Sequence, residues 1–197
     1  GMFEAVGQYV AGTIDAAQLE EMELNACPSC GSCAGLFTAN TMNSLVEALG
    51  IGLPGNGTIP APYGQRRALA KKAGQQAVAL VKQGLRPRDI MTLNAFHNAV
   101  SLDMAIGGSS NTVLHLLAIA SEAGVPLELE AFDRISARVP NICKLSPSGI
   151  HRMSDLHEAG GISAVLKQMA EQGLLSLEEK TVTGQTLGSN ISQAKVL

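Results

Sequence analysis

The sequence has few aromatic residues and no tryptophan, which argues against several classes of nucleic-acid-binding protein. Aromatic side chains make up only 3% of the 197 residues, too few for the stacking platforms that bind single strands. There is no block of basic residues, and a net charge of −3 gives no positive footprint for a phosphate backbone. We therefore expect no nucleic-acid partner and a protein that acts on a small molecule.

Long hydrophobic runs are also lacking. The longest strongly apolar stretch, residues 113–120, is interrupted by His115 and is far too short to cross a bilayer. The first residues do not combine a basic segment with an apolar run, so the sequence predicts no secretory signal, no membrane association and a cytoplasmic location. Four cysteines in such a chain indicate metal binding or catalysis rather than a disulfide framework.

What the sequence does contain is a series of helical patterns, with enough hydrophobic residues (46%) to form a core. Asp15 and Gln18 form the pattern of a capping box at the start of a short helix. Further helices are expected at about residues 42–49, 66–82, 93–105, 113–123, 128–137 and 162–169. Residues 53–64, rich in proline and glycine, are expected to form a loop.

Two local features of this pattern can be tested by a structure. Asn111 is expected to cap the helix at 113–123, and the apolar residues all round that helix predict burial at the centre of a domain. We expect it to be exposed or covered in a dimer if the chain does not fold independently. Residues 139–145 are the best strand candidate, although Pro140 limits them to an edge or to a loop.

The first pattern that indicates a chemical function is a run of three cysteines. Cys27, Cys30 and Cys33 form a C-x-x-C-x-x-C run just before a predicted helix, and thiolates at this spacing can converge on one point. Iron–sulfur ligation, structural zinc and inert buried thiols are all compatible with the spacing alone. The fourth cysteine, Cys143, is distant in the sequence and is interpreted as a small buried hydrophobic residue.

Longer motifs give the chain a family resemblance. The stretch ACPSCGSCAGLFTANTMNSLVEALGIGLPGNG at residues 26–57 resembles the dihydroxy-acid dehydratases, a family that also contains phosphogluconate and sugar-acid dehydratases. The resemblance continues through LDMAIGGSSNTVLHL at 102–116, ARVPNICKLSPSG at 137–149 and DLHEAGG at 155–161. It covers roughly residues 15–175. The LPGNG and VPNICKLSPSG stretches are more similar to the enzymes of branched-chain amino-acid biosynthesis than to the sugar-acid members.

The resemblance implies a hydro-lyase that converts a 2,3-dihydroxy acid into a 2-keto acid. It implies an iron–sulfur cluster, of the 2Fe–2S or 4Fe–4S type, held by three cysteines, and Mg²⁺ on the substrate. Cys33, which precedes the TANTM pattern, corresponds to one cluster ligand. Cys27 and Cys30 are absent from many relatives and are only secondary candidates. Leu36 stands where many relatives carry methionine, and this changes no ligand.

The resemblance also implies that much of the site lies outside this chain. The family's other two cluster cysteines belong upstream, one of them in a Cys-Asp-Lys motif that supplies magnesium ligands, and no such motif occurs here. The serine base belongs well beyond Leu197, so no catalytic residue is expected in this chain. We interpret residues 1–197 as part of the N-terminal domain, an internal fragment without a complete second domain, and inactive alone.

The same resemblance also predicts the fold and the assembly of the protein. The family domain is α/β, and this part of it should be predominantly α-helical with few short strands. Family members form dimers or tetramers, so we expect a homo-oligomer. Ser109 and Ser110, in the GGSSN loop, are candidates for contact with the substrate, although on local grounds a tight turn capped by Asn111 is the favoured explanation of the loop. A sugar-acid dehydratase and a small zinc-binding helical module remain as alternatives.

Overall fold

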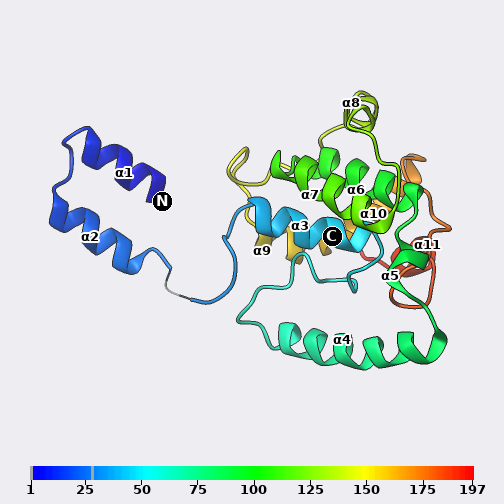
Figure 1. Ribbon diagram of the computed structural model, residues 1–197. Helices are drawn as coiled ribbons and strands as arrows, with labels where there is room; N and C mark the ends of the chain where they lie inside the picture. The colour runs from blue at the N-terminus through cyan, green and yellow to red at the C-terminus, as the bar shows by residue number, and fades with distance from the viewer. Residues whose placement is uncertain (1, 28) are drawn as a thin grey trace. The chain divides into compact units, whose positions relative to one another are not determined.

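The computed structural model describes residues 2–27 and 29–197, so Pro28 of the cysteine run lies outside the described residues. The chain divides into two units, Gly1–Gly31 and Ser32–Leu197. Its helices are α1 (Met2–Val10), α2 (Ala16–Asn25), α3 (Thr38–Ala48), α4 (Gly64–Gln83), α5 (Pro87–Ile90), α6 (Leu93–Ile106), α7 (Asn111–Ala123), α8 (Glu130–Ser136), α9 (Met153–Glu158), α10 (Gly161–Glu171) and α11 (Leu187–Ser192) (Figure 1).

The first unit consists of α1 and α2, which pack against each other as a helical hairpin (Figure 1). The predicted capping box is confirmed at the start of α2. Asp15 accepts a hydrogen bond from the Gln18 amide at 2.8 Å, and the Gln18 side chain accepts one from the Asp15 amide at 2.9 Å. The sequence analysis did not predict α1.

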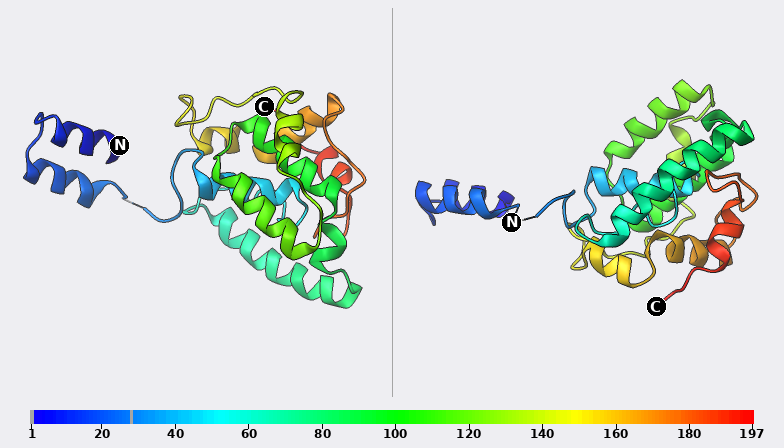
Figure 2. Two further views of the ribbon diagram at one scale, coloured as in Figure 1. Left: turned by 45° about the horizontal axis from the view of Figure 1, so that its top comes forward. Right: turned by 90° about the horizontal axis from the view of Figure 1, so that it is seen from below.

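In the second unit the central element is α6, which contacts α3, α7 and α8. Ten of its fourteen residues are buried, and alanines on it such as Ala95 and Ala99 allow neighbouring helices to approach closely. Helix α10, which covers the helix predicted at 162–169, also contacts α3 and buries Ile162, Val165, Leu166 and Met169. The core is therefore helix packed on helix, with α6 at its centre. Figure 2 shows the helices from two further directions.

The prediction that the helix at 113–123 is buried all round is wrong. In α7 the buried residues are Thr112, Leu116 and Ala120, which lie on one line of the helix, while Leu114 is 68% exposed. The hydrophobic pattern of the sequence therefore did not identify the central helix. Helix α6 has small residues on several faces, so several helices can pack against it, whereas α7 carries bulky residues and packs on one face only.

The cap of α7 also differs from the prediction. The helix begins at Asn111 itself and is preceded by Ser110, which makes no side-chain cap. The Asn111 side chain instead donates a hydrogen bond to Thr38 Oγ1 at 2.8 Å. Asn111 therefore does not cap its own helix, as the sequence suggested, but connects α7 to the start of α3.

Of the two possibilities left open for 139–145, an edge strand or a loop, the structure shows the loop. The described residues contain no strand, only isolated bridges such as the one between Leu145 and His151. The amides of Ile142 and Cys143 both donate to the Ala105 carbonyl, at 2.8 and 3.2 Å. The segment thus satisfies its polar groups at the end of α6 instead of joining a sheet. The mainly helical expectation is confirmed, and α11 was not predicted.

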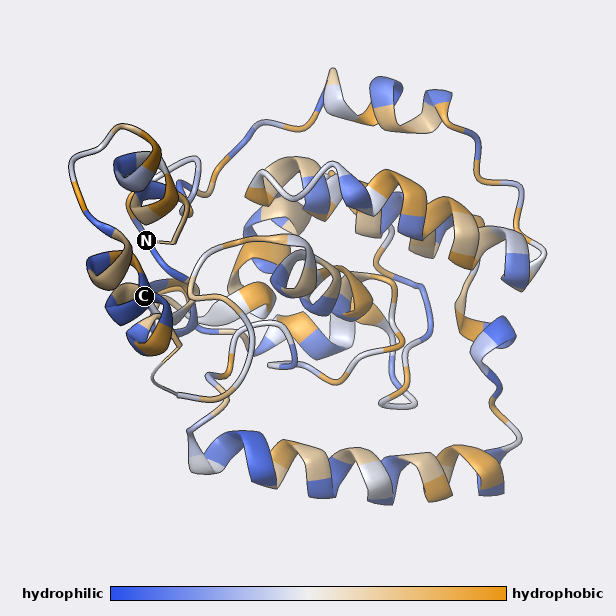
Figure 3. Cartoon of the chain, turned by 60° about the vertical axis from the view of Figure 1, so that its left-hand side comes forward, coloured by the Kyte–Doolittle hydropathy of each residue, from blue (hydrophilic) through white to orange (hydrophobic). Residues whose placement is uncertain are grey.

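Helix α4 confirms the helix predicted at 66–82, and in Figure 3 hydrophilic and hydrophobic residues alternate along it. It ends at Gly84, whose φ of 67° is the left-handed conformation that glycine adopts without strain. None of its residues is buried. Across the part of the chain that the structure describes, no helix is both long and apolar enough to span a membrane.

Candidate functional site

Cys33 is exposed, but the backbone around it is tightly held. Asn40, only 6% exposed in the first turns of α3, donates from Nδ2 to the carbonyls of Cys33 at 2.5 Å and Gly35 at 2.7 Å. Its Oδ1 accepts a hydrogen bond from Ser32 Oγ at 2.6 Å. One buried amide thereby fixes the loop on both sides of the thiol, while the sulfur itself faces solvent.

A second set of contacts fixes the same loop from the other side. The Leu36 amide donates to the Ser146 carbonyl at 2.6 Å, and the Met153 amide donates to the Ala34 carbonyl at 2.9 Å. A Cβ added at Gly35 would lie 2.6 Å from the Ser146 oxygen, which explains the glycine there. The VPNICKLSPSG motif is thus connected to the Cys33 loop through Ser146, a link that sequence spacing could not reveal.

The GGSSN loop attaches to the same end of α3. The Ser109 and Thr38 hydroxyl oxygens are 3.0 Å apart, and the Ser109 amide donates to Thr41 Oγ1 at 3.2 Å. Ser110, by contrast, is exposed. Two sequence-predicted candidates, Cys33 and Ser109, are therefore positioned by the first turn of one helix. Ser110 is next to Ser109 in the chain and has no side-chain cap bond.

Asp103, which no sequence pattern singled out, lies beneath this loop near the end of α6. The residue is 4% exposed, and its Oδ2 accepts a hydrogen bond from Thr112 Oγ1 at 2.5 Å. Burial raises the pKa of Asp103 to about 6, with the Thr112 hydrogen bond acting in the opposite direction. The only signal in the sequence was a charged residue at an otherwise apolar helical position.

The LPGNG motif has a structural role on α3. The buried Glu47 accepts hydrogen bonds from the amides of Gly55 at 3.0 Å and Gly57 at 2.6 Å. Burial raises its pKa to about 7, opposed by these two hydrogen bonds and by the charge of Arg66. Arg66 in turn donates to the carbonyls of Asn56 and Ile59. The motif thus folds its loop around a carboxyl on α3.

The other cysteines differ in their exposure. Cys27 and Cys30 belong to the first unit and are exposed. Cys143 is partly buried against the core, and burial raises the pKa of its thiol, in agreement with a small packed side chain. Among the residues that the structure describes, no three His, Cys, Asp or Glu side chains gather as a metal site. Within the second unit, Cys33 is thus an exposed cysteine whose backbone carbonyl is held by Asn40.

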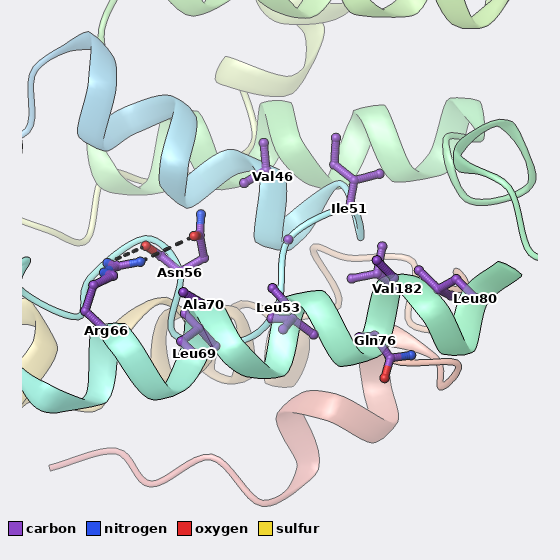
Figure 4. Close-up of a pocket in the computed structure, with 13 residues that line it drawn as sticks. Val46, Ile51, Leu53, Asn56, Arg66, Leu69, Ala70, Gln76, Leu80 and Val182 are labelled. Atoms are coloured by element: carbon purple, nitrogen blue, oxygen red, sulfur yellow. Dashed lines mark hydrogen bonds between the residues drawn. The ribbon is translucent and has the colours of Figure 1, made fainter.

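A separate hollow of about 420 Å³ lies between α4 and the loop that follows α3 (Figure 4). Val46, Ile51, Leu53 and Val182 face the α4 side chains Leu69 and Leu80 across it. Its polar end is Arg66, whose guanidinium is already bonded to Asn56. The hollow is apolar and belongs to the packing of α4, with no side chain suited to chemistry.

The bracing of Cys33 gives a first prediction. Asn40→Asp keeps the shape of the side chain but removes the donor that reaches the Cys33 and Gly35 carbonyls. We expect the free energy of unfolding to fall by about 2–3 kcal/mol, because two close carbonyls then face a buried carboxylate. Urea unfolding measures this. Asn43→Asp, at an exposed position of the same helix, is the control, and equal losses for both variants would contradict the bracing role.

The sequence of the chain matches a known protein family. The model of the dihydroxy-acid/6-phosphogluconate dehydratase N-terminal family matches residues 1–190. The chain therefore belongs to the dihydroxy-acid/6-phosphogluconate dehydratase family.

Individual relatives carry a more particular name. The chain is 61% identical to a dihydroxy-acid dehydratase of Clostridium novyi, over all of this chain and 36% of that relative's length. It is also 61% identical to one of Caldanaerobacter subterraneus, over 99% of this chain and 35% of the relative, and 55% identical to one of Solidesulfovibrio magneticus, over 98% and 35%. The chain thus spans about 35% of the length of these curated relatives.

Proposed function

We propose that this chain is part of a hydro-lyase that dehydrates 2,3-dihydroxy acids to 2-keto acids in branched-chain amino-acid biosynthesis. The observation that carries the proposal is the exposed Cys33, braced by Asn40, in a chain that belongs to this dehydratase family. The relatives named dihydroxy-acid dehydratase support the branched-chain substrate class. The family membership favours this function over the small zinc-binding module predicted as an alternative.

The reaction needs two groups to leave the substrate. A proton departs from C2 and hydroxide from C3, together one water, and the resulting enol tautomerises to the keto acid. An iron–sulfur centre, when bound, supplies a Lewis-acidic iron that helps the 3-hydroxyl to leave. In our proposal Cys33 is one thiolate ligand of that centre, Cys27 and Cys30 are secondary candidates, and Mg²⁺ binds the substrate through residues outside this chain.

The chain's own residues would act mainly by positioning. Asn40 holds the Cys33 backbone, and Thr38 and Thr41 hold Ser109 on the adjoining loop. Fixed geometry of this kind lowers the cost of bringing a ligand and a substrate group together. We propose Ser109 and Ser110 as substrate contacts, because their loop is attached to the helix that follows Cys33.

The proposal extends to the complete protein. We propose that residues 1–197 form part of an α/β N-terminal domain, that the protein works as a cytoplasmic homo-oligomer, either a dimer or a tetramer, and that the chain is inactive alone. One cysteine on a braced loop cannot hold a cluster that requires three thiolates. A sugar-acid substrate is a second candidate, since the matched family model also covers 6-phosphogluconate dehydratases.

Anaerobic reconstitution tests the proposal. We expect the 197-residue chain, incubated with iron and sulfide, to show no charge-transfer absorbance and no keto-acid formation, while the complete protein that carries this segment shows both. Branched 2,3-dihydroxy acids and 6-phosphogluconate, supplied in parallel, separate the two substrate classes by keto-acid yield. A stable brown species or keto acid from the chain alone would contradict its proposed incompleteness, and a complete protein inactive on both acids would overturn the assigned reaction.

A further inference from the structure

The carboxyl of Asp103 is an unusual group for the interior of this helical unit. It is 4% exposed, and its Oδ1 atom is buried without a hydrogen-bond partner. Thr112 faces it from α7, and Gly108 packs between the carboxyl and Thr41 of α3. None of these three neighbours titrates. An ionised carboxylate with an unpartnered oxygen in such a place would carry a large desolvation cost.

In the described part of the chain, no charged group bonded to the carboxyl offsets that cost. The helices packed on α6 are α3, α7 and α8, and the segment after α8 is bonded to the end of α6. On α3, Glu47 accepts hydrogen bonds from the amides of Gly55 and Gly57 instead. The other titratable or charged side chains on these elements and on α6 itself are exposed or half-buried, namely His97, His115, Glu122, Glu130, Asp133, Arg134, Arg138, Cys143 and Lys144. The hydrogen-bond partner of the carboxyl is the neutral hydroxyl of Thr112.

The number of protons available at Thr112 also favours a protonated Asp103. The Thr112 hydroxyl has one proton, yet its oxygen lies 2.5 Å from Asp103 Oδ2 and 2.6 Å from the Ser109 carbonyl. If Asp103 is ionised, both neighbours are acceptors and one short contact has no proton. If Asp103 carries a proton on Oδ2, it donates to Thr112, and Thr112 then donates to Ser109. Both short contacts of the Thr112 hydroxyl are then hydrogen bonds.

We propose that Asp103 is a positioning residue whose protonated, neutral form holds Ser109 and its loop, through the Thr112 hydroxyl, against the first turn of α3. The connection is continuous in the structure. Asp103 reaches Thr112, Thr112 reaches the Ser109 carbonyl, and the Ser109 amide and hydroxyl reach Thr41 and Thr38. The link to substrate binding rests on the function proposed above, whereas the link to loop geometry does not.

Three variants separate the neutral-acid role from simple packing. Asp103→Asn has the shape of the neutral acid and supplies an amide donor to Thr112. Asp103→Leu has a similar size but no donor, and Thr112→Val removes the relaying hydroxyl. The readout is hydrogen exchange of the Ser109 amide, which donates to Thr41 Oγ1, measured by NMR on the 197-residue chain. The Leu36 amide, bonded to Ser146, serves as the internal control for global unfolding.

In the unsubstituted chain we expect Ser109 protection to fall roughly tenfold, the equivalent of one net hydrogen bond, as the pH rises through the pKa of Asp103 at about 6. Asp103→Asn should keep its protection at every pH, and Asp103→Leu and Thr112→Val should lose it at every pH. Leu36 protection should be the same in all four proteins. If Asp103→Leu does not fold, Thr112→Val still gives the decisive comparison.

Two results would overturn the proposal. One is a carboxyl carbon of Asp103 that titrates near the ordinary value of about 4. The other is an Asp103→Asn variant that loses Ser109 protection as Asp103→Leu does. Because the exchange measurement needs neither cofactor nor substrate, its outcome is independent of the proposed reaction. A complete protein that is inactive while this exchange pattern holds would count against the proposed function only.

Discussion

Replacing Cys33 by serine in the complete protein is expected to abolish bound iron and to lower keto-acid formation more than about 100-fold, beyond the upper end of what loss of an outer-shell partner of a metal site costs. The reason is chemical, since a serine hydroxyl stays protonated at neutral pH and is a poor ligand for iron in a sulfur-based site. The fold should survive, because the thiol is exposed and the bonds that brace this loop are made by Asn40 and by backbone groups.

The matched controls for Cys33→Ser are Cys27→Ser and Cys30→Ser, at the other exposed cysteines of the run. Because Cys27 and Cys30 are only secondary candidates for ligands, iron content and turnover should fall much less in these two variants than in Cys33→Ser. Equal loss of iron in all three variants would show instead that the C-x-x-C-x-x-C run holds the metal as a unit. Normal iron content in Cys33→Ser would remove Cys33 from the proposed site altogether.

The second large effect is expected at Gly108, where an alanine should lower the free energy of unfolding by about 3 kcal/mol or more, the upper range for overpacking. An added Cβ would overlap Asp103 Oδ1 and lie 2.5 Å from Thr41 Cγ2. Both neighbours are buried, so neither can swing away into solvent. The loop that carries Ser109 would therefore have to leave the first turn of α3.

Gly74→Ala is the control for this prediction, because a Cβ at that position meets nothing within 4 Å in the middle of α4. It should stabilise the chain by about 0.5–1 kcal/mol, the difference in helix propensity between glycine and alanine. Urea unfolding of both variants provides the measurement. A Gly108→Ala protein as stable as the unsubstituted one would mean that the loop does not pack on Asp103 as described.

Local sequence signals predicted much of the fold because their physics is local. The capping box at Asp15 satisfies the start of a helix within a few residues, so it can be recognised without a tertiary structure. The helices at 66–82 and 162–169 were predicted for the same reason, because their patterns repeat within one or two turns. By contrast, the helix at the centre of the core was not identified, because burial depends on which faces other helices cover.

For the candidate site, too, the residues predicted from the sequence are those that belong to a recognisable local motif. Cys33 and Ser109 were singled out from their motifs, and the structure positions both by way of α3. Whether they bind cluster and substrate stays a prediction. Asp103 was missed, because its contacts with Thr112 and Gly108 depend on how the loop between α6 and α7 folds back over it, which the sequence pattern does not give. Asn111 was predicted to cap a helix, but its hydrogen-bond partner, Thr38, is 73 residues away in the sequence.

The apolar hollow beneath α4 has a mechanical consequence. Water that enters such a space under hydrostatic pressure reduces the volume of the system, so the element that covers it is favoured to detach. Helix α4 buries none of its residues and is anchored at one end by Arg66. Compression should therefore loosen α4 first, while the helices around α6, which enclose tightly packed side chains, keep their arrangement to higher pressure.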